Sequence, residues 1–385
     1  MDFEYSEEQK MLKRNCHDFM EREIAPLVDE YEKRGVTISK EEAKNFIKKL
    51  IPLGYVVGLI DEEHGGLGLD SVSYGLLLEE LSYTWVSLGN IVHITALEAL
   101  SLVQGAGEDL ITEYLPPLLS GDIIGCMAIS EPDVGSGAPR GIKTRAVLDG
   151  DEYVINGTKT WISNGSISDL AEVLCMVDEG KGASELCSII VDRRESPYTA
   201  TDYHKVGWHA ASTAEVSFDN CRVPKRNLIK GGGGLVQEAL GMNRAFVAVR
   251  ACGVAQAAID ASIKYARERV QFGKPIGRFQ LIQEMIVDMV TKTDSARLLA
   301  LRALELLNKG IQCPKETSMA KAYCCEIVNE VTSKAIQVHG AMGLMEDLPV
   351  ERYFRDARVF SIPDGTTEIQ KLIVGREILG MHAFV

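Results

Sequence analysis

Residues 360–377 read FSIPDGTTEIQKLIVGRE and place an acid at a sharp turn that leads into a helix. The apolar residues before Pro363 predict an extended run that stops at this proline. The Gly-Thr-Thr sequence at 365–367 predicts a turn, and either threonine can cap the following helix. Backbone amides at a helix start are unpaired, so an acid beside them can act as a base and help to bind an anion. Asp364 is therefore a candidate base; the alternative is that it only caps the helix in an ordinary Pro-Asp-Gly turn.

Composition narrows the classes of protein to which the chain can belong. Its 385 residues are enough for two or three domains, and 46% apolar with 25% charged residues is typical of a globular protein. A net charge of −14 argues against nucleic acid and anionic membranes as main partners. An anionic substrate would therefore need a local basic pocket.

The cysteines and the amino terminus predict a cytoplasmic protein. Nine cysteines, including the adjacent Cys324 and Cys325, contain no CxxC pair, and reduced thiols are the simplest reading. The start, MDFEYSEEQKMLKRN, is charged and amphipathic, which predicts no signal peptide. No apolar run is expected to reach membrane-spanning length.

The periodicity of apolar residues changes twice along the chain. Residues 1–121 follow helical spacing, interrupted by the glycine-rich loop IDEEHGGLGLD at 60–70. Residues 122–230 predict a β domain, in which 147–157 forms an alternating strand with a hairpin turn at each end. Short apolar runs predict further strands at 173–177, 187–191 and 214–218.

Residues 231–385 return to helical spacing. Four glycines at 231–234 predict a hinge before a long helix, and two more long amphipathic helices are expected around 285–306 and 319–339. Long helices with apolar stripes predict a four-helix bundle. The expected fold is therefore α+β and multidomain: an all-α N-terminal domain, a middle β domain and a C-terminal four-helix bundle that carries Asp364.

Two segments of the β domain suit a flat heterocyclic cofactor. CMAISEPDVGS at 126–136 offers hydroxyls and main-chain amides that can bond a ring edge or a diphosphate, although a plain helix-to-strand connection fits equally well. In WISNG at 161–165, an aromatic and a hydroxyl two residues later fall on one strand face. A ring can lie against Trp161, unless this is a buried core tryptophan.

Two segments of the helical C-terminal part place cations or glycines at helix ends. RERVQFGKPIGRFQ at 267–280 ends a long helix with cations, and Arg269 with 272–274 can grip a diphosphate. QVHGAMG at 337–343 combines a helix end with glycines beyond it. Neither segment is decisive alone.

Taken in order, these segments resemble those of the acyl-CoA dehydrogenase family. The resemblance covers essentially the whole chain and rests on HGGLGLD, ISEPDVGSG, NGTKTWISNG, RVQFGKPI, IQVHGAMG, RDARV and DGTTEIQ. It implies an N-terminal helical domain, a middle β-barrel-like domain and a C-terminal four-helix bundle, with FAD between the last two. It also implies an acyl-CoA substrate, electron-transferring flavoprotein as the acceptor, and a homotetramer built as a dimer of dimers.

The resemblance assigns site residues one by one and implies no metal site. Flavin contacts are implied for Met127, Ile129, Ser130, Trp161, Ser163 and Thr366. The FAD diphosphate and adenosine are implied to contact Arg269, Phe272 and Gln280 of the neighbouring subunit, with Gln337 and Gly340 completing that site. Substrate contacts are implied for Ser136, which also touches the flavin or the CoA arm, and for Asn243, Arg244, Asp364 and Gly365.

The implied reaction is oxidation between Cα and Cβ of the thioester. Asp364 removes the α-proton from one face while hydride passes from Cβ to flavin N5 on the other. Two donors stabilise the developing enolate: the flavin ribityl 2′-hydroxyl and the main-chain amide of Asp364. A carboxylate serves well here when burial raises its pKa toward the working pH.

The sequence departs from the family pattern at the base. Most members carry Glu, usually after Tyr, where Asp364 follows Pro363. Some members place the base on the helix corresponding to 235–251, where Asn243 cannot serve, and another subgroup has an acid near 90–91, where none stands. Asp364 therefore remains as the base.

The shorter acid and the compact proline are expected to leave space beside Cα. The resemblance adds that the family members that oxidise cyclohexane-1-carboxyl-CoA form a group in which Asp replaces the usual Glu. An alicyclic acyl-CoA, specifically cyclohexane-1-carboxyl-CoA, is therefore the expected substrate. One alternative is a short linear or branched acyl-CoA. Others are a different flavin reaction on the same fold (flavin reductase, desulfinase or 1,4-dehydrogenase) and a non-catalytic flavin or acyl-CoA binding protein.

Overall fold

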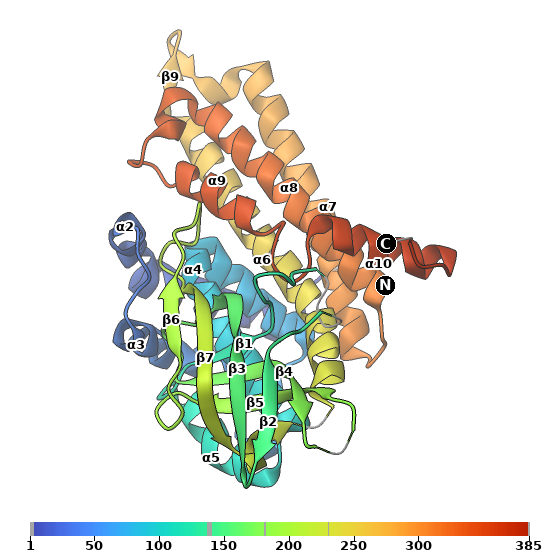
Figure 1. Cartoon of the computed structure of the whole chain (residues 1–385). Helices are drawn as coiled ribbons and strands as arrows, with labels where there is room; N and C mark the ends of the chain where they lie inside the picture. The colour runs from blue at the N-terminus through green and yellow to red at the C-terminus, as the bar shows by residue number, and fades with distance from the viewer. Residues whose placement is uncertain (1–3, 137–140, 181, 230, 384–385) are drawn as a thin grey trace.

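The computed structural model describes residues 4–136, 141–180, 182–229 and 231–383. In chain order it has a helical part, a sheet and a second helical part, as predicted (Figure 1). The first helix begins at a capping box formed by Ser6 and Gln9. The helices of the first part are α1 (Glu7–Phe19), α2 (Ala25–Lys33), α3 (Lys40–Leu50), α4 (Ser71–Gly105) and α5 (Glu108–Leu119), with a π-helical turn at Met20–Ile24 and 3-10 turns at Ile51–Leu53 and Glu62–His64.

Helix α4 is buried on nearly all sides and links the parts of the molecule. Its sequence is apolar around the whole circumference, which is typical of a helix inside a core. It bends at Trp85, whose φ of −154° and ψ of 95° are not helical. Beyond the bend, the carbonyl of Ile91 accepts a 2.9 Å hydrogen bond from the side chain of Asn164 in the sheet part.

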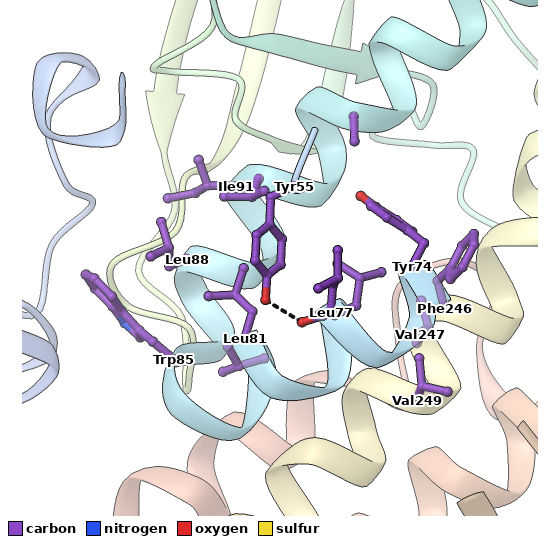
Figure 2. Packing of buried hydrophobic residues seen from close by; sticks show 14 of the residues in the cluster. Tyr55, Tyr74, Leu77, Leu81, Trp85, Leu88, Ile91, Phe246, Val247 and Val249 are labelled. Carbon is purple, nitrogen blue, oxygen red and sulfur yellow. Dashed lines mark hydrogen bonds between the residues drawn. The ribbon is translucent and has the colours of Figure 1, made fainter. Parts of the chain in front are cut away.

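The first half of α4 packs tightly against α6 (Gly232–Glu268) of the second helical part (Figure 2). The ring of Tyr74 meets that of Phe246 edge to face, with centroids 5.4 Å apart. At Gly253 the two helices are so close that a Cβ atom would lie 2.3 Å from the carbonyl oxygen of Glu79. Only glycine fits at this crossing.

The expectation that no apolar run reaches membrane-spanning length is wrong. Helix α4 and the Glu238–Glu268 part of α6 are long and apolar enough to cross a membrane, with mean hydropathies of 1.5 and 1.4 over their most apolar windows. However, 83% and 78% of those windows are buried inside the protein. Their apolar composition is explained by packing in the core, which surrounds both helices.

The middle of the chain forms one eight-stranded sheet around a core of its own. The order is β6-β7-β3-β2-β4-β5-β8, with β1 beside β4; β1 and β2 run parallel to β4, and the other neighbours are antiparallel. The strands are β1 (Gly125–Ala128), β2 (Arg145–Asp149), β3 (Glu152–Ser163), β4 (Leu170–Asp178), β5 (Glu185–Asp192), β6 (Thr199–Asp202), β7 (Thr213–Pro224) and β8 (Leu228–Ile229), with a 3-10 turn at Lys225–Asn227.

One of the two hairpin turns predicted around 147–157 is wrong. The turn at Gly150, with φ of 65°, joins β2 to β3 as expected. At Gly157, however, β3 continues, with a shift of register against β7. A Cβ atom there would lie 2.8 Å from the Cα atom of Thr144, so this glycine permits a close approach of two chain segments instead of a turn.

The second helical part contains three long helices that pack on one another, α6, α7 and α8, with α10 packed on α8. Besides α6 they are α7 (Gln280–Asn308), α8 (Pro314–His339), α9 (Val350–Val359) and α10 (Thr367–Leu379). A hairpin of β9 (Val270–Gln271) and β10 (Lys274–Pro275) follows α6, and 3-10 turns lie at Ile276–Arg278 and Gly340–Leu344.

Two local predictions in this part are wrong. Residues 232–234 form the first turn of α6, so the glycine run is not a hinge; Gly231, with φ of 73°, precedes the helix. The apolar residues before Pro363 are not extended: they form a turn directly after the amphipathic helix α9, and Phe360 keeps helical angles. Its ring is buried against that of Trp208, with centroids 5.0 Å apart.

Candidate active site

Asp364 lies on a rigid elbow between α9 and α10. Its φ of 58° is in the left-handed region, where a residue other than glycine is uncommon. Gln370 of α10 donates its side-chain N–H groups to the carbonyls of Asp364 and Gly365, both at 3.0 Å. The ammonium of the fully buried Lys321 in α8 donates to the same Gly365 carbonyl at 2.8 Å. The predicted cap is confirmed: Thr366 precedes α10 and accepts from the main-chain N–H of Ile369.

The carboxylate of Asp364 is held from α6. Nδ2 of Asn243 donates to Oδ1 of Asp364 at 3.0 Å. Oδ1 of Asn243 is in turn 2.6 Å from Nε2 of His93, which comes from α4. Asn243 was predicted to contact the substrate, and that contact stays a prediction; the structure instead shows both ends of its buried amide bound to protein groups.

Two arginines of α6 place positive charge near the elbow. Burial lowers the pKa of Arg250 to about 10, while the nearby charge of Asp364 acts in the opposite direction. The same two influences act on the half-buried Arg244, whose pKa is also lowered. Guanidinium groups are protonated at neutral pH, so the two arginines give the surroundings of the elbow a positive charge.

Arg250 packs against aromatic faces and forms no ion pair with any of the residues that the structure describes. Its guanidinium carbon lies 5.3 Å from the ring centre of Trp208 and 5.9 Å from that of Phe360. Nη2 is 3.4 Å from Oδ1 of Asn90 in α4. Arg244 is less constrained: its Nη1 is 3.5 Å from the hydroxyl of Ser318, and its buried Nε has no hydrogen-bond partner among the described residues.

The predicted flavin segments of the sheet lie side by side. The main-chain N–H of Thr160 donates to the carbonyl of Ser130 at 2.9 Å, which joins the end of β1 to β3. Met127, Ile129 and Ser130 are half-buried, as is Ser163. Ser136 is exposed, next to the segment 137–140 that lies outside the described residues.

Trp161 stands out from this surface and is not a core residue. Its side chain is 62% exposed, its φ is 61°, and the β3–β7 register shifts next to it. The indole lies over the ring of Tyr203, with centroids 4.5 Å apart and 34° between the planes. An exposed and supported aromatic of this kind can cover a flat ring.

The remaining predicted cofactor residues lie at the opposite end of the bundle. Arg269 and Phe272 lie between α6 and α7, in the segment that contains β9, and Gln280 is the first residue of α7 (Figure 1). Gln337 lies in the last turn of α8 and Gly340 directly after it, and the ring of His339 packs on that of Tyr265 in α6 at 4.4 Å. These five residues are exposed, and Phe272 is 91% exposed. Along α6, Arg269 is about 39 Å from Asn243, which is longer than an extended FAD molecule.

The predicted FAD contacts therefore form two groups in one chain. The sheet group offers an exposed aromatic, a half-buried hydroxyl and main-chain atoms, which suit a flavin ring. The distal group offers a cation, an aromatic and amide groups, which suit a diphosphate and an adenine. The residues fit FAD when the distal group comes from a second copy of the chain, as the resemblance implies.

Several residues around Asp364 were not found from the sequence. His93 and Arg250 lie in apolar helical runs, where a single polar residue is usually a satisfied core residue, and no spacing links either to residue 364. Lys321 lies on a helix whose sequence pattern is that of any amphipathic helix in a bundle, so nothing in the sequence distinguishes it. Gln370 was detectable in principle, because it is six residues from Asp364 and within one turn of the predicted helix start.

Three models of one protein family match the chain over nearly its whole length. Residues 6–122 match the acyl-CoA dehydrogenase N-terminal domain, 126–221 its middle domain and 230–379 its C-terminal domain.

Characterised relatives extend over nearly the full length. The chain is 35% identical to an acyl-CoA dehydrogenase of Bacillus subtilis (97% of this chain, 99% of the relative). It is 36% identical to a caffeyl-CoA reductase–Etf complex subunit of Acetobacterium woodii (97% and 99%) and 34% identical to the mitochondrial short-chain specific acyl-CoA dehydrogenase of Rattus norvegicus (98% and 91%).

Solved structures agree in fold. Butyryl-CoA dehydrogenase from Megasphaera elsdenii superposes with a TM-score of 0.91 at 31% identity, covering 98% of this chain and 100% of that one. Glutaryl-CoA dehydrogenase from Mycobacterium smegmatis, solved in complex with FADH2, gives 0.92 at 26% identity, covering 99% and 97%.

Proposed function

Because the chain belongs to the FAD-dependent acyl-CoA dehydrogenase family, we propose that Asp364 is the base that removes the α-proton of its acyl-CoA substrate. The observation that carries the proposal is the bond from Asn243 to a carboxylate fixed on a left-handed elbow. FAD, when bound, supplies the acceptor for the electrons removed from the substrate.

The residues around Asp364 have two roles: some hold the base in position, and others bind the substrate. Gln370 and Lys321 hold the elbow by its carbonyls, so the side chain of Asp364 keeps one position. Arg244, with an unsatisfied buried N–H, has the charge and the free donor needed by an anionic part of the substrate. The predicted roles of Gly365 and of the main-chain amide of Asp364 at the thioester are part of the same proposal.

The specific substrate is proposed to be an alicyclic acyl-CoA, with cyclohexane-1-carboxyl-CoA as the compound to test first. The support is the short acid after Pro363, which leaves room on the side of Cα from which the proton departs. The main alternative is a short linear acyl-CoA, and the rat short-chain enzyme and the Megasphaera butyryl-CoA dehydrogenase support that alternative.

The electron acceptor is proposed to be an electron-transferring flavoprotein. The support is the similarity to a subunit of a caffeyl-CoA reductase–Etf complex. The cytoplasm is the proposed location, because a sequence with nine cysteines and no CxxC pair suits a reducing compartment.

The proposed assembly is a homotetramer made of two dimers. Two observations support at least a dimer: the distance along α6 between Arg269 of the distal group and Asn243 beside the elbow, and the exposure of Phe272, Leu281 and Leu344. Apolar side chains this exposed are usually covered by another protein surface.

The proposal is tested by adding cyclohexanecarboxyl-, butyryl- and hexanoyl-CoA to the purified holoenzyme and following the flavin absorbance. One of them should bleach the flavin, and Asp364→Asn should slow the bleaching about 10²- to 10⁴-fold while FAD and thioester still bind. Bleaching by the Asn variant at the wild-type rate would show that another residue is the base. A kcat/KM about tenfold higher for a linear thioester would reject the alicyclic substrate.

A protein that binds FAD and acyl-CoA but is never bleached would favour the non-catalytic alternative. Failure to retain or take up FAD would contradict the cofactor assignment itself.

A further inference from the structure

A chain of hydrogen bonds crosses the core and ends on Asp364. Nε2 of His93 and Oδ1 of Asn243 are 2.6 Å apart, and Nδ2 of Asn243 donates to Oδ1 of Asp364 at 3.0 Å. On the other side of the imidazole, Nδ1 lies 3.4 Å from the hydroxyl of Tyr74. Tyr74 and His93 come from α4, Asn243 from α6 and Asp364 from the elbow, so three separate segments must meet to build the chain.

The chemistry of each group sets the direction of these bonds. An amide oxygen can only accept, so Nε2 of His93 must carry the proton, and the bare Nδ1 accepts from the phenol of Tyr74. The Asn243 amide then has its N–H group toward the carboxylate. Burial lowers the pKa of His93 to about 3, with Arg250 acting in the same direction, so the ring stays neutral at physiological pH. Every donor in the chain therefore points toward Asp364.

We propose that His93 is a positioning residue for the base, which acts by fixing the Asn243 amide so that its N–H holds one carboxylate oxygen and leaves the other for the substrate proton. The inference rests on the proposed role of Asp364. Without the imidazole N–H, the amide could turn over and present its oxygen to the carboxylate, which would repel it. A misplacement of about 1 Å can cost about a hundredfold in rate, so loss of the bond that holds the Asp364 carboxylate should slow the reaction measurably.

A purely structural role for His93 predicts different observations. All three of Tyr74, His93 and Asn243 are buried, and buried polar groups need partners regardless of catalysis. Loss of a structural bond would lower thermal stability and FAD content. Loss of a positioning bond would slow removal of the α-proton in enzyme that still binds FAD and thioester.

The test uses the FAD-loaded enzyme and the acyl-CoA of the panel that bleaches the wild type fastest. His93→Leu should slow flavin reduction about 10- to 100-fold, with thioester affinity and FAD content unchanged. The isotope effect on flavin reduction with α-deuterated thioester should increase. His93→Gln should restore most of the rate, because a carboxamide N–H can replace the imidazole N–H. In a matched control, Ser262→Ala removes a buried bond within α6 (2.7 Å to the carbonyl of Ala258) and should change neither rate nor isotope effect.

Two further measurements sharpen the result. Asn243→Leu combined with His93→Leu should be no slower than Asn243→Leu alone, since both act through one contact. Nitrogen-15 NMR of the histidines in the wild type should show a neutral Nε2–H tautomer for His93. An Nδ1–H tautomer or a charged ring would overturn the proposal without any variant, even if His93→Leu fails to fold.

The outcomes separate this inference from the proposed function. If Asp364→Asn bleaches at the wild-type rate, the base is elsewhere and the proposed function fails. If Asp364→Asn is slow but His93→Leu reacts like the wild type with the same isotope effect, only the role of His93 is refuted.

Discussion

The ammonium of Lys159 and the carboxylate of Glu131 form an ion pair at 2.9 Å, with side chains 0% and 4% exposed. The same ammonium donates to the carbonyl of Ile129 at 3.0 Å. Main-chain N–H groups of Lys143 and Thr144 complete the coordination of Glu131, at 2.7 and 2.9 Å. This pair fixes the turn after β1 onto β3, and so places the predicted flavin segment beside Trp161.

Lys159→Met should therefore reduce both stability and FAD retention. Removing one partner leaves a buried charge uncompensated, at a cost of about 3–5 kcal/mol in the free energy of unfolding. Lys143→Met is the matched control, because its side chain and that of its partner Asp133 are 68% and 75% exposed. The control should lose less than about 1 kcal/mol. Urea unfolding and the ratio of flavin to protein absorbance measure the two effects, and equal losses in both variants would contradict this account.

Gly253→Ala should destabilise the protein even though alanine is the better helix former. The new methyl group would lie 2.3 Å from the carbonyl oxygen of Glu79, so α4 and α6 must separate, at a cost of about 1–3 kcal/mol. At Gly241 of the same helix no atom lies within 4 Å of the added Cβ, and Gly241→Ala should be neutral or stabilising by up to about 1 kcal/mol. The denaturant midpoint should fall for Gly253→Ala and should stay unchanged or rise for Gly241→Ala; an unchanged or raised midpoint for Gly253→Ala would mean that the crossing is not tight.

Acid should destabilise the protein through His93. The pKa of its ring is lowered from 6.5 to about 3, first by burial and then by Arg250, with Asn243 opposing. Below pH 6.5 the unfolded chain therefore binds a proton that the folded protein does not, and the free energy of unfolding falls as the pH falls toward 3. The stability advantage of the wild type over His93→Gln should be about 2 kcal/mol smaller at pH 5 than at pH 7.

The measurement compares the wild type with His93→Gln because another buried group changes the free energy of unfolding with pH in the opposite direction. The pKa of Asp356 is raised to about 7, mainly by burial and by the neighbouring Glu32. Its folded form takes up a proton near neutral pH, so this group adds stability as the pH falls from about 7 toward 4. A constant difference between wild type and His93→Gln from pH 7 to 5 would mean that His93 is accessible to protons.

Phe272→Asp should prevent assembly and FAD binding while leaving the fold of the chain intact. The ring is 91% exposed and touches only the Phe279 ring edge among the described aromatic contacts, so its loss costs little within one chain. A charge placed in a covered interface would be strongly unfavourable. Val36→Asp, at a 53% exposed apolar side chain of the first helical part, is the control. Light scattering and flavin content should change for Phe272→Asp alone.

Local sequence signals were sufficient for the order of elements and for the turn at Asp364. Periodicity separates helix from strand, and Thr366 caps α10 as its neighbours predict. The glycines were misread, because residue 157 and the run 232–234 look like turns or hinges in sequence, whereas close packing and helix continuation decide their roles. The residues around Asp364 could not be predicted from the sequence. His93 and Arg250 come near Asp364 because two apolar helices cross in the fold, and no local pattern indicates that crossing.

The crossing of α4 and α6 has a consequence for synthesis of the protein. The core shared by the two helical parts joins residues such as Tyr74 to Val249 and Leu304, while the sheet has a core of its own. On the ribosome, α4 is complete about 140 residues before its partner face on α6, a delay on the order of 10–30 s at usual elongation rates. During that time the nascent chain displays one of its most apolar helices without cover. The sheet can fold during this time, because it has a core of its own. The first helical part cannot bury its apolar surface until the second helical part is synthesised, and a chaperone is expected to cover that surface until then.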